Sequence, residues 1–225
     1  MAEGLQVFSS GSGVLQVNSD YRNIAFVDSF TVSIAANSWG VSSQISYVDT
    51  SYTYAYRAEP GYENVNCSMY LDAGRLLFIV EQRKSVVVRV YRFRTGGVAN
   101  TNFGLEVFNA AGQLSFSSGN RYMKVLDFIY YGDTFLTSPA FTRSYNSRPA
   151  IYIGTLGCAG RFTVREPDGY WTWIQRFSTF SFSGNSFTFN PTGAVQTDEG
   201  VGGSPAYDNY SNNASSALVI DVSGL

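Results

Sequence analysis

The sequence contains no histidine. Histidine is the side chain that most often serves as a general base near neutral pH, and it is the commonest protein ligand for zinc. Its absence excludes Ser-His-Asp and Cys-His catalytic groups and histidine-ligated metal sites. The acidic residues lack the spacing of a calcium loop, and no glycine-rich loop leads from a strand into a helix. We therefore expect no bound metal and no cofactor.

Charge is also scarce. Charged residues make up 14% of the chain, whereas about 25% is usual in soluble domains. The 15 Lys and Arg residues are scattered and the formal net charge is −2, so no cationic track is present for a phosphate backbone. We expect no nucleic-acid partner. The weakly charged surface is expected either to be partly covered by protein partners or to be the Ser- and Asn-rich surface of an ordinary β-protein.

Long apolar runs are missing as well. The longest, residues 76–80, is too short to cross a bilayer, and no charged segment followed by an apolar one comes after Met1. The sequence therefore predicts no membrane span and synthesis in the cytoplasm. The only two cysteines, Cys67 and Cys158, show no CxxC spacing, and we expect both to be free thiols in a β-core.

The periodic segments have a period of two residues, and no window shows the spacing of an amphipathic helix. Leu5 and Val7, then Leu15 and Val17 after the glycine-rich turn 11–13, predict a hairpin with one buried face. Further strands are expected at 24–30, 75–81, 85–93, 123–130, 151–154, 160–165, 170–183, 186–190 and 217–222, with a hairpin turn at 82–84. The fold class is therefore predicted to be all-β.

The opening of the chain is repeated. Residues 4–8, GLQVF, return at 104–108 as GLEVF, followed by a second hairpin pattern. Five later matches, shifted by one residue, are Gly13, Leu15, Ser19, Arg22 and Asp28 with Gly112, Leu114, Ser118, Arg121 and Asp127.

A spacing of about 100 residues is too long for a solenoid and suits a small sandwich domain. We therefore predict two tandem, internally related β-sandwich-like domains, 1–95 and 102–225, with a linker at 96–101. The second is expected to contain a long, mobile Gly/Ser/Asn-rich loop at 191–216. The two openings are expected to form equivalent three-stranded corners.

The charged residues allow one enzymatic alternative. Two carboxylates facing each other across a cleft are the catalytic groups of glycoside hydrolases. The candidate pairs, Glu59 with Glu63 and Glu166 with Asp168, lie in turns rich in Pro and Gly, and turn formation explains them better. The duplicated pairs Arg22 with Asp28 and Arg121 with Asp127 are each expected to form an ion pair or hold a turn within their own unit. We predict that the protein is not an enzyme.

The aromatic residues are the strongest candidates for a binding site. Tyr52, Tyr54 and Tyr56 alternate along one expected strand and share one face, and Trp171 and Trp173 do the same further on. Such a row is typical of a sugar-stacking platform, of an oligomer interface or of one half of a sandwich core. The sequence leaves these three possibilities open.

The repeated opening resembles the start of small tail-associated proteins of tailed bacteriophages and prophages. The resemblance covers about 25 residues of each repeat and rests on residues 4–8, Leu15 and 22–28, and on residues 104–114 and 121–125. It implies a virion structural protein of the distal tail, in the tip, baseplate or fibre region, assembled in the host bacterial cytoplasm.

The resemblance also implies partners. Other phage tail proteins are the expected neighbours, and a symmetric homo-oligomer is expected, with a trimer favoured. The resemblance also implies a contribution to host attachment. The alternative function is a carbohydrate- or receptor-binding module, which would use the aromatic strand face to bind a bacterial surface receptor or glycan.

Overall fold

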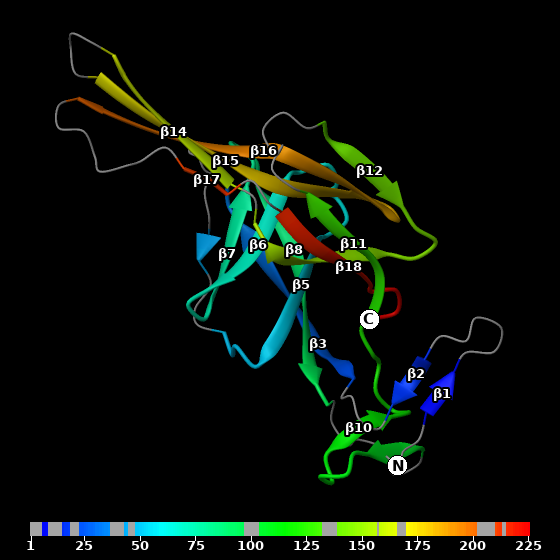
Figure 1. The fold of residues 1–225 in the computed structure, drawn as a ribbon. Helices are drawn as coiled ribbons and strands as arrows, with labels where there is room; N and C mark the ends of the chain where they lie inside the picture. The colour runs from blue at the N-terminus through cyan, green and yellow to red at the C-terminus, as the bar shows by residue number, and fades with distance from the viewer. Residues whose placement is uncertain are drawn as a thin grey trace.

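The structure is a computed structural model, and it describes residues 6–8, 15–18, 23–36, 43–44, 48–96, 104–131, 139–156, 158–165, 170–201, 210–212 and 215–225. Strands dominate these residues and no helix occurs among them, which confirms the predicted all-β class. The same residues accordingly contain no helix with the length and apolar character needed to cross a membrane. Figure 1 shows two large sheets with small hairpins at one end.

The first large sheet has six strands in the order β11-β18-β13-β5-β8-β3. Its strands are β3 (Ile24–Ile34), β5 (Tyr52–Ala58), β8 (Val86–Thr95), β11 (Lys124–Tyr131), β13 (Pro149–Thr155) and β18 (Ser215–Asp221). Neighbouring strands in this sheet pair antiparallel throughout the described residues. The first and second halves of the chain meet where Tyr56 of β5 pairs with Ile151 of β13.

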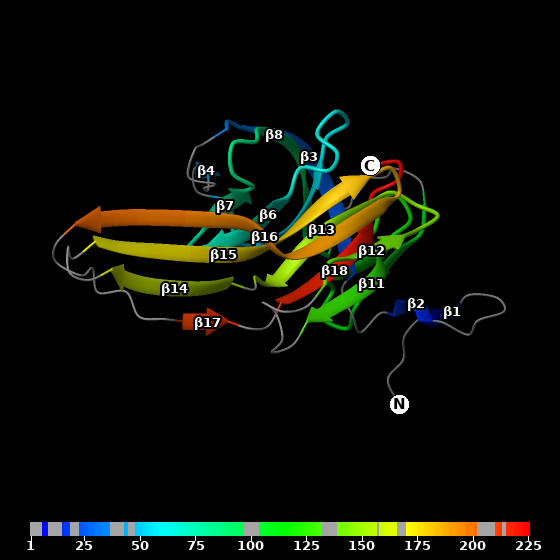
Figure 2. The same ribbon diagram turned by 90° about the horizontal axis from the view of Figure 1, so that it is seen from above.

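The second large sheet has the order β12-β16-β15-β6-β7-β4, with β14 beside β15 and β17 beside β14. Its strands are β4 (Ser43–Gln44), β6 (Cys67–Asp72), β7 (Arg75–Val80), β12 (Phe141–Ser144), β14 (Cys158–Arg165), β15 (Tyr170–Ser183), β16 (Ser186–Val201) and β17 (Tyr210–Asn212). Figures 1 and 2 show β14, β15 and β16 running together beyond the rest of the molecule as a long arm.

Both strand orders are mirrored about their centres. In the six-stranded sheet β5 and β13 lie in the middle, then β8 and β18, then β3 and β11. In the other sheet β6 and β15 lie in the middle, then β7 and β16, then β4 and β12. Each half of the chain thus supplies matching strands to both sheets, and the expected units 1–95 and 102–225 share both of them. Of the expected linker 96–101, only Gly96 lies among the described residues.

Two predicted hairpins are present, β1 (Gln6–Phe8) with β2 (Leu15–Asn18) and β9 (Glu106–Phe108) with β10 (Leu114–Ser117). Their registers match, because Val7 lies opposite Val17 and Val107 opposite Phe116, with a bulge beside each pair. The expected three-stranded corners are wrong, however. Each hairpin is a separate two-stranded sheet, whereas β3 and β11 belong to the six-stranded sheet, where their long apolar faces find a core.

The two edges of the six-stranded sheet meet at one end. The backbone N–H of Phe26 in β3 donates to the carbonyl oxygen of Arg121 at 2.6 Å, and the N–H of Met123 donates to that of Ile24 at 2.8 Å. Residues 121–123 lead directly into β11, so the first and last strands of the sheet are joined there. The sheet is therefore curled, and Figure 2 shows the bend in β3 and β8.

Curling explains why the central strands of the six-stranded sheet are buried on both faces. One face packs on the second sheet around fully buried side chains such as Val88 and Phe187. The other face encloses a smaller cluster that contains Tyr91 and Phe93. Side chains of β8 therefore pack into both cores. This explains why the sequence of β8 is nearly continuously apolar.

The expected hairpin turn at 82–84 is wrong. β7 and β8 lie in different sheets, so the turn carries the chain across the core, with Arg83 in the left-handed region at φ 63°. β7 pairs instead with β6. The tight turn between β6 and β7 holds Ala73 at φ 45° and Gly74 at φ 76°, and such angles suit a two-residue hairpin turn.

The expected loop at 191–216 is wrong for its first part. β16 continues to Val201, which lies opposite Tyr170 at the start of β15. The long β15 offers backbone partners along its length, and these hydrogen bonds outweigh the Gly- and polar-rich composition of the segment. Residues 210–212 form β17 and β18 begins at Ser215, while 202–209 and 213–214 lie outside the described residues.

Candidate functional site

The tyrosine row of β5 points into the core. Tyr56 is fully buried and Tyr54 is 4% exposed, so neither ring lies on the outer surface of the protein. The hydroxyl of Tyr56 donates to the carbonyl oxygen of Cys67 at 2.8 Å, and that of Tyr54 donates to the carbonyl oxygen of Asp49 at 2.8 Å. Burial raises the pKa of both hydroxyls. Of the three, only Tyr52 is half-exposed.

Trp171 and Trp173 lie on β15, far along the chain from β5 and in the other sheet. Trp171 is opposite Val164 and Gly200, and Trp173 is opposite Phe162 and Asp198, which places both residues in the arm. Their side chains lie outside the described part of the structure. The predicted site residues are therefore divided between the core and the arm.

A pocket of about 440 Å³ opens between the two large sheets, beside Tyr52. Six of its lining residues are threonines or tyrosines, whose side chains end in a hydroxyl group: Thr50, Tyr52, Thr53, Tyr54, Tyr70 and Tyr152. The others are Met69, Leu71, Leu76, Ile153, Gly154 and Leu156. None of these side chains is charged. The pocket thus combines polar hydroxyls with an apolar lining, as small-molecule sites commonly do.

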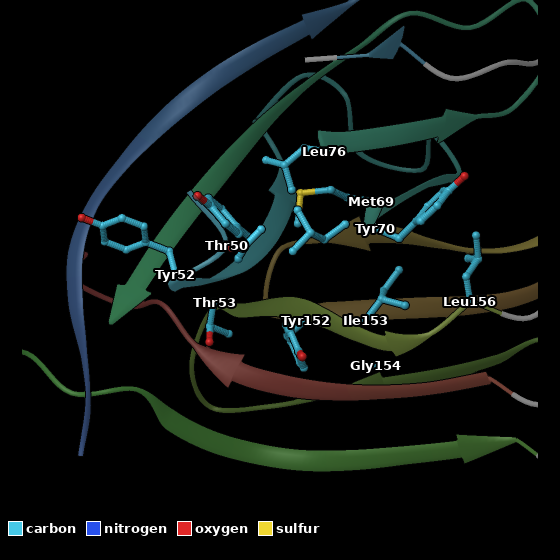
Figure 3. Close-up of a pocket in the computed structure, with 12 residues that line it drawn as sticks. Thr50, Tyr52, Thr53, Met69, Tyr70, Leu76, Tyr152, Ile153, Gly154 and Leu156 are labelled. Atoms are coloured by element: carbon cyan, nitrogen blue, oxygen red, sulfur yellow. The ribbon is translucent and has the colours of Figure 1, made fainter. Parts of the chain in front are cut away.

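Strands from both halves of the chain build this pocket. β5 supplies Tyr52, the β6–β7 hairpin supplies Tyr70 and Leu76, and β13 supplies Ile153. In Figure 3, Tyr52 and Tyr70 stand at opposite ends of the pocket, with Leu76 and Met69 between them. Sequence reasoning missed this site because its residues come together only when β13 pairs beside β5. The tyrosine row of β5, which contributes Tyr52 and Tyr54 to the lining, was the local signal that the sequence offered.

Tyr52 is held in place by its neighbours. The guanidinium group of Arg92 lies 5.2 Å from the centre of the Tyr52 ring, and the Tyr54 ring meets it edge-on at 6.3 Å. Asp28 in turn accepts two hydrogen bonds from Arg92, one of them from Nε at 2.6 Å. The hydrogen bond from Arg92 lowers the pKa of Asp28, so the ion pair is charged at neutral pH.

The duplicated aspartates both form ion pairs, Asp28 with Arg92 and Asp127 with Arg143. Asp127 accepts hydrogen bonds from Arg143, from the Tyr145 hydroxyl at 2.8 Å and from the N–H of Phe128 at 2.8 Å. Burial and the bond to Asp127 raise the pKa of Tyr145 to about 12. Of the two roles expected for Arg121 and Asp127, an ion pair with each other is not formed, because Asp127 pairs with Arg143 and Arg121 donates to the carbonyl oxygen of Gly224. Arg22 lies outside the described residues.

Each of these aspartates follows a β-bulge. The register of β3 shifts between Phe26 and Asp28, and that of β11 shifts between Val125 and Asp127. A bulge turns the following side chain relative to the pleat, so it can set the direction of a carboxylate. The ion pair of Asp28 with Arg92 lies within the first half of the chain, and that of Asp127 with Arg143 lies within the second half. This agrees with a structural role for the duplicated aspartates.

The carboxylates weighed as catalytic groups also have structural partners. Glu59 forms an ion pair with Arg89, and Glu63 accepts the N–H of Gly61 at 2.6 Å within its turn. Glu166 and Asp168 lie outside the described residues. Across the described ranges, no cluster of three or more Cys, Asp or Glu side chains is arranged to hold a metal ion.

Cys67 is a free, fully buried thiol at the centre of the main core, as predicted. Burial, with a smaller contribution from Glu81, raises its pKa to about 12. A thiol that keeps its proton is a poor nucleophile, so Cys67 is a packing residue. The side chain of Cys158 lies outside the described part of the structure.

The edge strand β11 carries large exposed apolar side chains. Val125 is 48% exposed, Phe128 57% and Tyr130 65%. Within the described residues β11 pairs with β18 alone, so its other backbone edge has no strand partner there. An edge of this kind favours contact with another chain.

Comparison of the chain with protein-family models, with curated proteins and with solved structures gives no match.

Proposed function

We propose that this protein is a non-enzymatic structural component of a bacteriophage tail, placed in the tip, baseplate or fibre region. The resemblance of the repeated opening gives the class, and the exposed apolar edge of β11 is the observation that carries a structural role. Phe128 and Tyr130 project from an edge strand whose outer backbone groups have no strand partner among the described residues. A second protein chain on this edge removes both features from water.

The opposite edge of the same sheet supports this interpretation. β3 and β11 hold equivalent places in the mirrored strand order, and their bulges match. Counting from the bulge, Phe128 and Tyr130 correspond to Ser29 and Thr31 on β3. A requirement of folding alone would act on both edges, whereas at these two matched positions only β11 carries aromatic residues. The matched hairpin registers and bulges also support the hypothesis that the two halves arose by tandem duplication.

We propose that the partner at β11 is a second copy of this chain, in a symmetric homo-oligomer. The resemblance favours three copies around the tail axis, and the contact is then head-to-tail, with β11 meeting a different surface of the next copy. The low charge of the chain, 14%, agrees with surfaces covered by neighbours. A non-enzymatic role is supported by Asp28, Asp127 and Glu59, which are each engaged by an arginine.

Two measurements test this proposal. Phage particles purified from a host that carries the gene are expected to contain the protein by mass spectrometry, and immunogold labelling is expected at the distal tail. Light scattering of the purified protein is expected to give the mass of three chains. Absence from the particles contradicts the tail location, and a strict monomer contradicts the assembly.

The second candidate function is a carbohydrate- or receptor-binding module. Tyr54 and Tyr56 are too deeply buried to stack on a ligand, so the strand face first considered does not supply this function. The uncharged pocket beside Tyr52 is the observation that keeps the candidate. Its ligand is the subject of the next inference.

A further inference from the structure

We infer that the pocket between β5, β6 and β13 binds one ring of a neutral sugar. The inference rests on the proposed function only for the origin of the sugar, which is then a polysaccharide of the bacterial surface. The site itself follows from three features of the described residues: its volume, the chemistry of its lining and the fixed position of Tyr52.

The volume suits a small, compact ligand. At about 440 Å³ the pocket falls at the lower part of the range of small-molecule sites, roughly 300 to 1,000 Å³. Leu71, at its rim, is 44% exposed although its neighbour Met69 is buried. A large apolar side chain at the mouth of a polar pocket provides a surface on which the apolar face of a ligand can rest.

The lining selects for a neutral molecule with both hydroxyls and an apolar face. Tyrosine and threonine hydroxyls can donate and accept hydrogen bonds, and aromatic and aliphatic groups cover C–H surface. No lining residue is charged, so a carboxylate or phosphate on the ligand would lose water without gaining a charged partner. A pyranose ring has hydroxyls around its rim and C–H groups on its faces, and it matches this lining.

Tyr52 is positioned before any ligand arrives. The guanidinium group of Arg92 lies over its ring at 5.2 Å, and the Tyr54 ring meets it edge-on at 6.3 Å. Arg92 is fixed by its ion pair with Asp28, which also neutralises its charge. A ring that is already ordered loses little conformational entropy on binding, and this favours affinity for a weakly interacting ligand such as a sugar.

The test is a binding titration of the full-length protein by ligand-observed NMR. The neutral probes are methyl glucoside, methyl galactoside, methyl mannoside, methyl rhamnoside and N-acetylglucosamine, and the charged probes are glucuronic acid and N-acetylneuraminic acid. We expect at least one neutral sugar to saturate the protein below about 50 mM. No saturation by any neutral probe, or equal binding of the charged probes, overturns the inference.

Three variants test whether the sugar binds in this pocket. Tyr52→Ala is expected to weaken binding at least about fivefold, because a side chain that lines one end of the pocket is removed. Leu71→Ala, at a half-exposed rim position, is expected to weaken it in the same direction and covers the case in which Tyr52→Ala does not fold. Phe108→Ala, at a 50% exposed aromatic position of β9 outside both the pocket and the β11 edge, is the matched control and is expected to bind as the unaltered protein does.

The outcomes separate the site from the proposed function. Binding that is unaffected by both Tyr52→Ala and Leu71→Ala overturns the pocket even if the protein is found in phage tails. Binding that both variants weaken supports the pocket even if the protein is absent from particles, in which case the proposed tail function fails alone.

Discussion

The hydroxyl of Tyr56 donates a hydrogen bond to the carbonyl oxygen of Cys67, and this 2.8 Å bond joins the two large sheets through the middle of their shared core. Tyr56 belongs to β5 and Cys67 to β6, the central strands that the first half of the chain gives to each sheet. Both residues are fully buried. A polar bond at this position fixes how the sheets lie on each other, in addition to the non-directional packing around it.

The first prediction concerns this bond. Tyr56→Phe keeps the ring but removes the donor, and we expect the free energy of unfolding to fall by about 1 kcal/mol. Urea unfolding followed by fluorescence measures the change. Tyr52→Phe, at a half-exposed ring, is the control and is expected to change stability less. An unchanged stability in Tyr56→Phe contradicts a role for this bond.

The second prediction concerns pH. The pKa of Cys67 is raised to about 12 in the folded protein, whereas an unfolded thiol titrates near about 8.5. As the pH rises between these values the unfolded state loses the proton and the native state keeps it, so the contribution of Cys67 to stability is lost by about 1.4 kcal/mol per pH unit. Below about pH 8 this contribution is fully present.

Cys67→Ala lacks the thiol and therefore lacks this pH dependence. The difference in free energy of unfolding between the unaltered protein and the variant is expected to shrink from pH 8 to pH 10, measured by urea unfolding at each pH. A difference that stays constant over this range would show that the thiol is not held protonated in the native state.

The third prediction concerns a close approach of β15 and β16. A Cβ atom at Gly193 would collide with Oγ1 of the buried Thr179 and lie 2.9 Å from Cβ of Asn190. We expect Gly193→Ala to lower the free energy of unfolding by about 1–3 kcal/mol. Thr179 Oγ1 has no hydrogen-bond partner among the described atoms, so Thr179→Ala removes the colliding hydroxyl without breaking a hydrogen bond.

A double-mutant cycle measures the coupling between these two residues. The double variant is expected to be more stable than the sum of the two single changes predicts, because each change acts on the same contact. Strict additivity would show that Gly193 is not needed for the close approach.

The fourth prediction concerns the β11 edge. The double variant Phe128→Ser and Tyr130→Thr places on β11 the residue types that β3 carries at the matching positions. We expect the assembly to dissociate to monomers in light scattering, with stability changed by no more than about 0.5 kcal/mol. Leu105→Ser, at a 52% exposed position before the β9–β10 hairpin, is the control for loss of any exposed apolar group. An unchanged mass in the β11 variant contradicts an interface at this edge.

Local pattern predicted most strands, and β15 was predicted with the bounds that it has, residues 170–183. Alternation shows which residues share a face, but it does not show which strands are neighbours. The 82–84 turn illustrates this limit, since β7 and β8 both read as strands and still belong to different sheets. The strand at 191–201 escaped prediction because its polar composition is compensated only by pairing with β15.

The candidate site was less accessible from the sequence. The tyrosine row on β5 was identified, and one of the possibilities left open, a sandwich core, describes Tyr54 and Tyr56. The pocket needs Tyr52, Tyr70 and Ile153 together, and these residues come from strands that are distant in sequence. Only the mirrored pairing of the two halves brings them into contact.

The mirrored strand order also determines which strands lack a partner while the chain is being synthesised. When the first 96 residues have left the ribosome, the inner edges of β5 and β6 have no neighbour, because β13 and β15 are still to be synthesised. Ile24 and Phe26 likewise wait for residues 121–123 to close the curled sheet. Such distant pairings make folding slow and leave apolar strands open for its duration. The nascent chain is therefore expected to depend on chaperones after its first half has been synthesised and before the second half can pair with it.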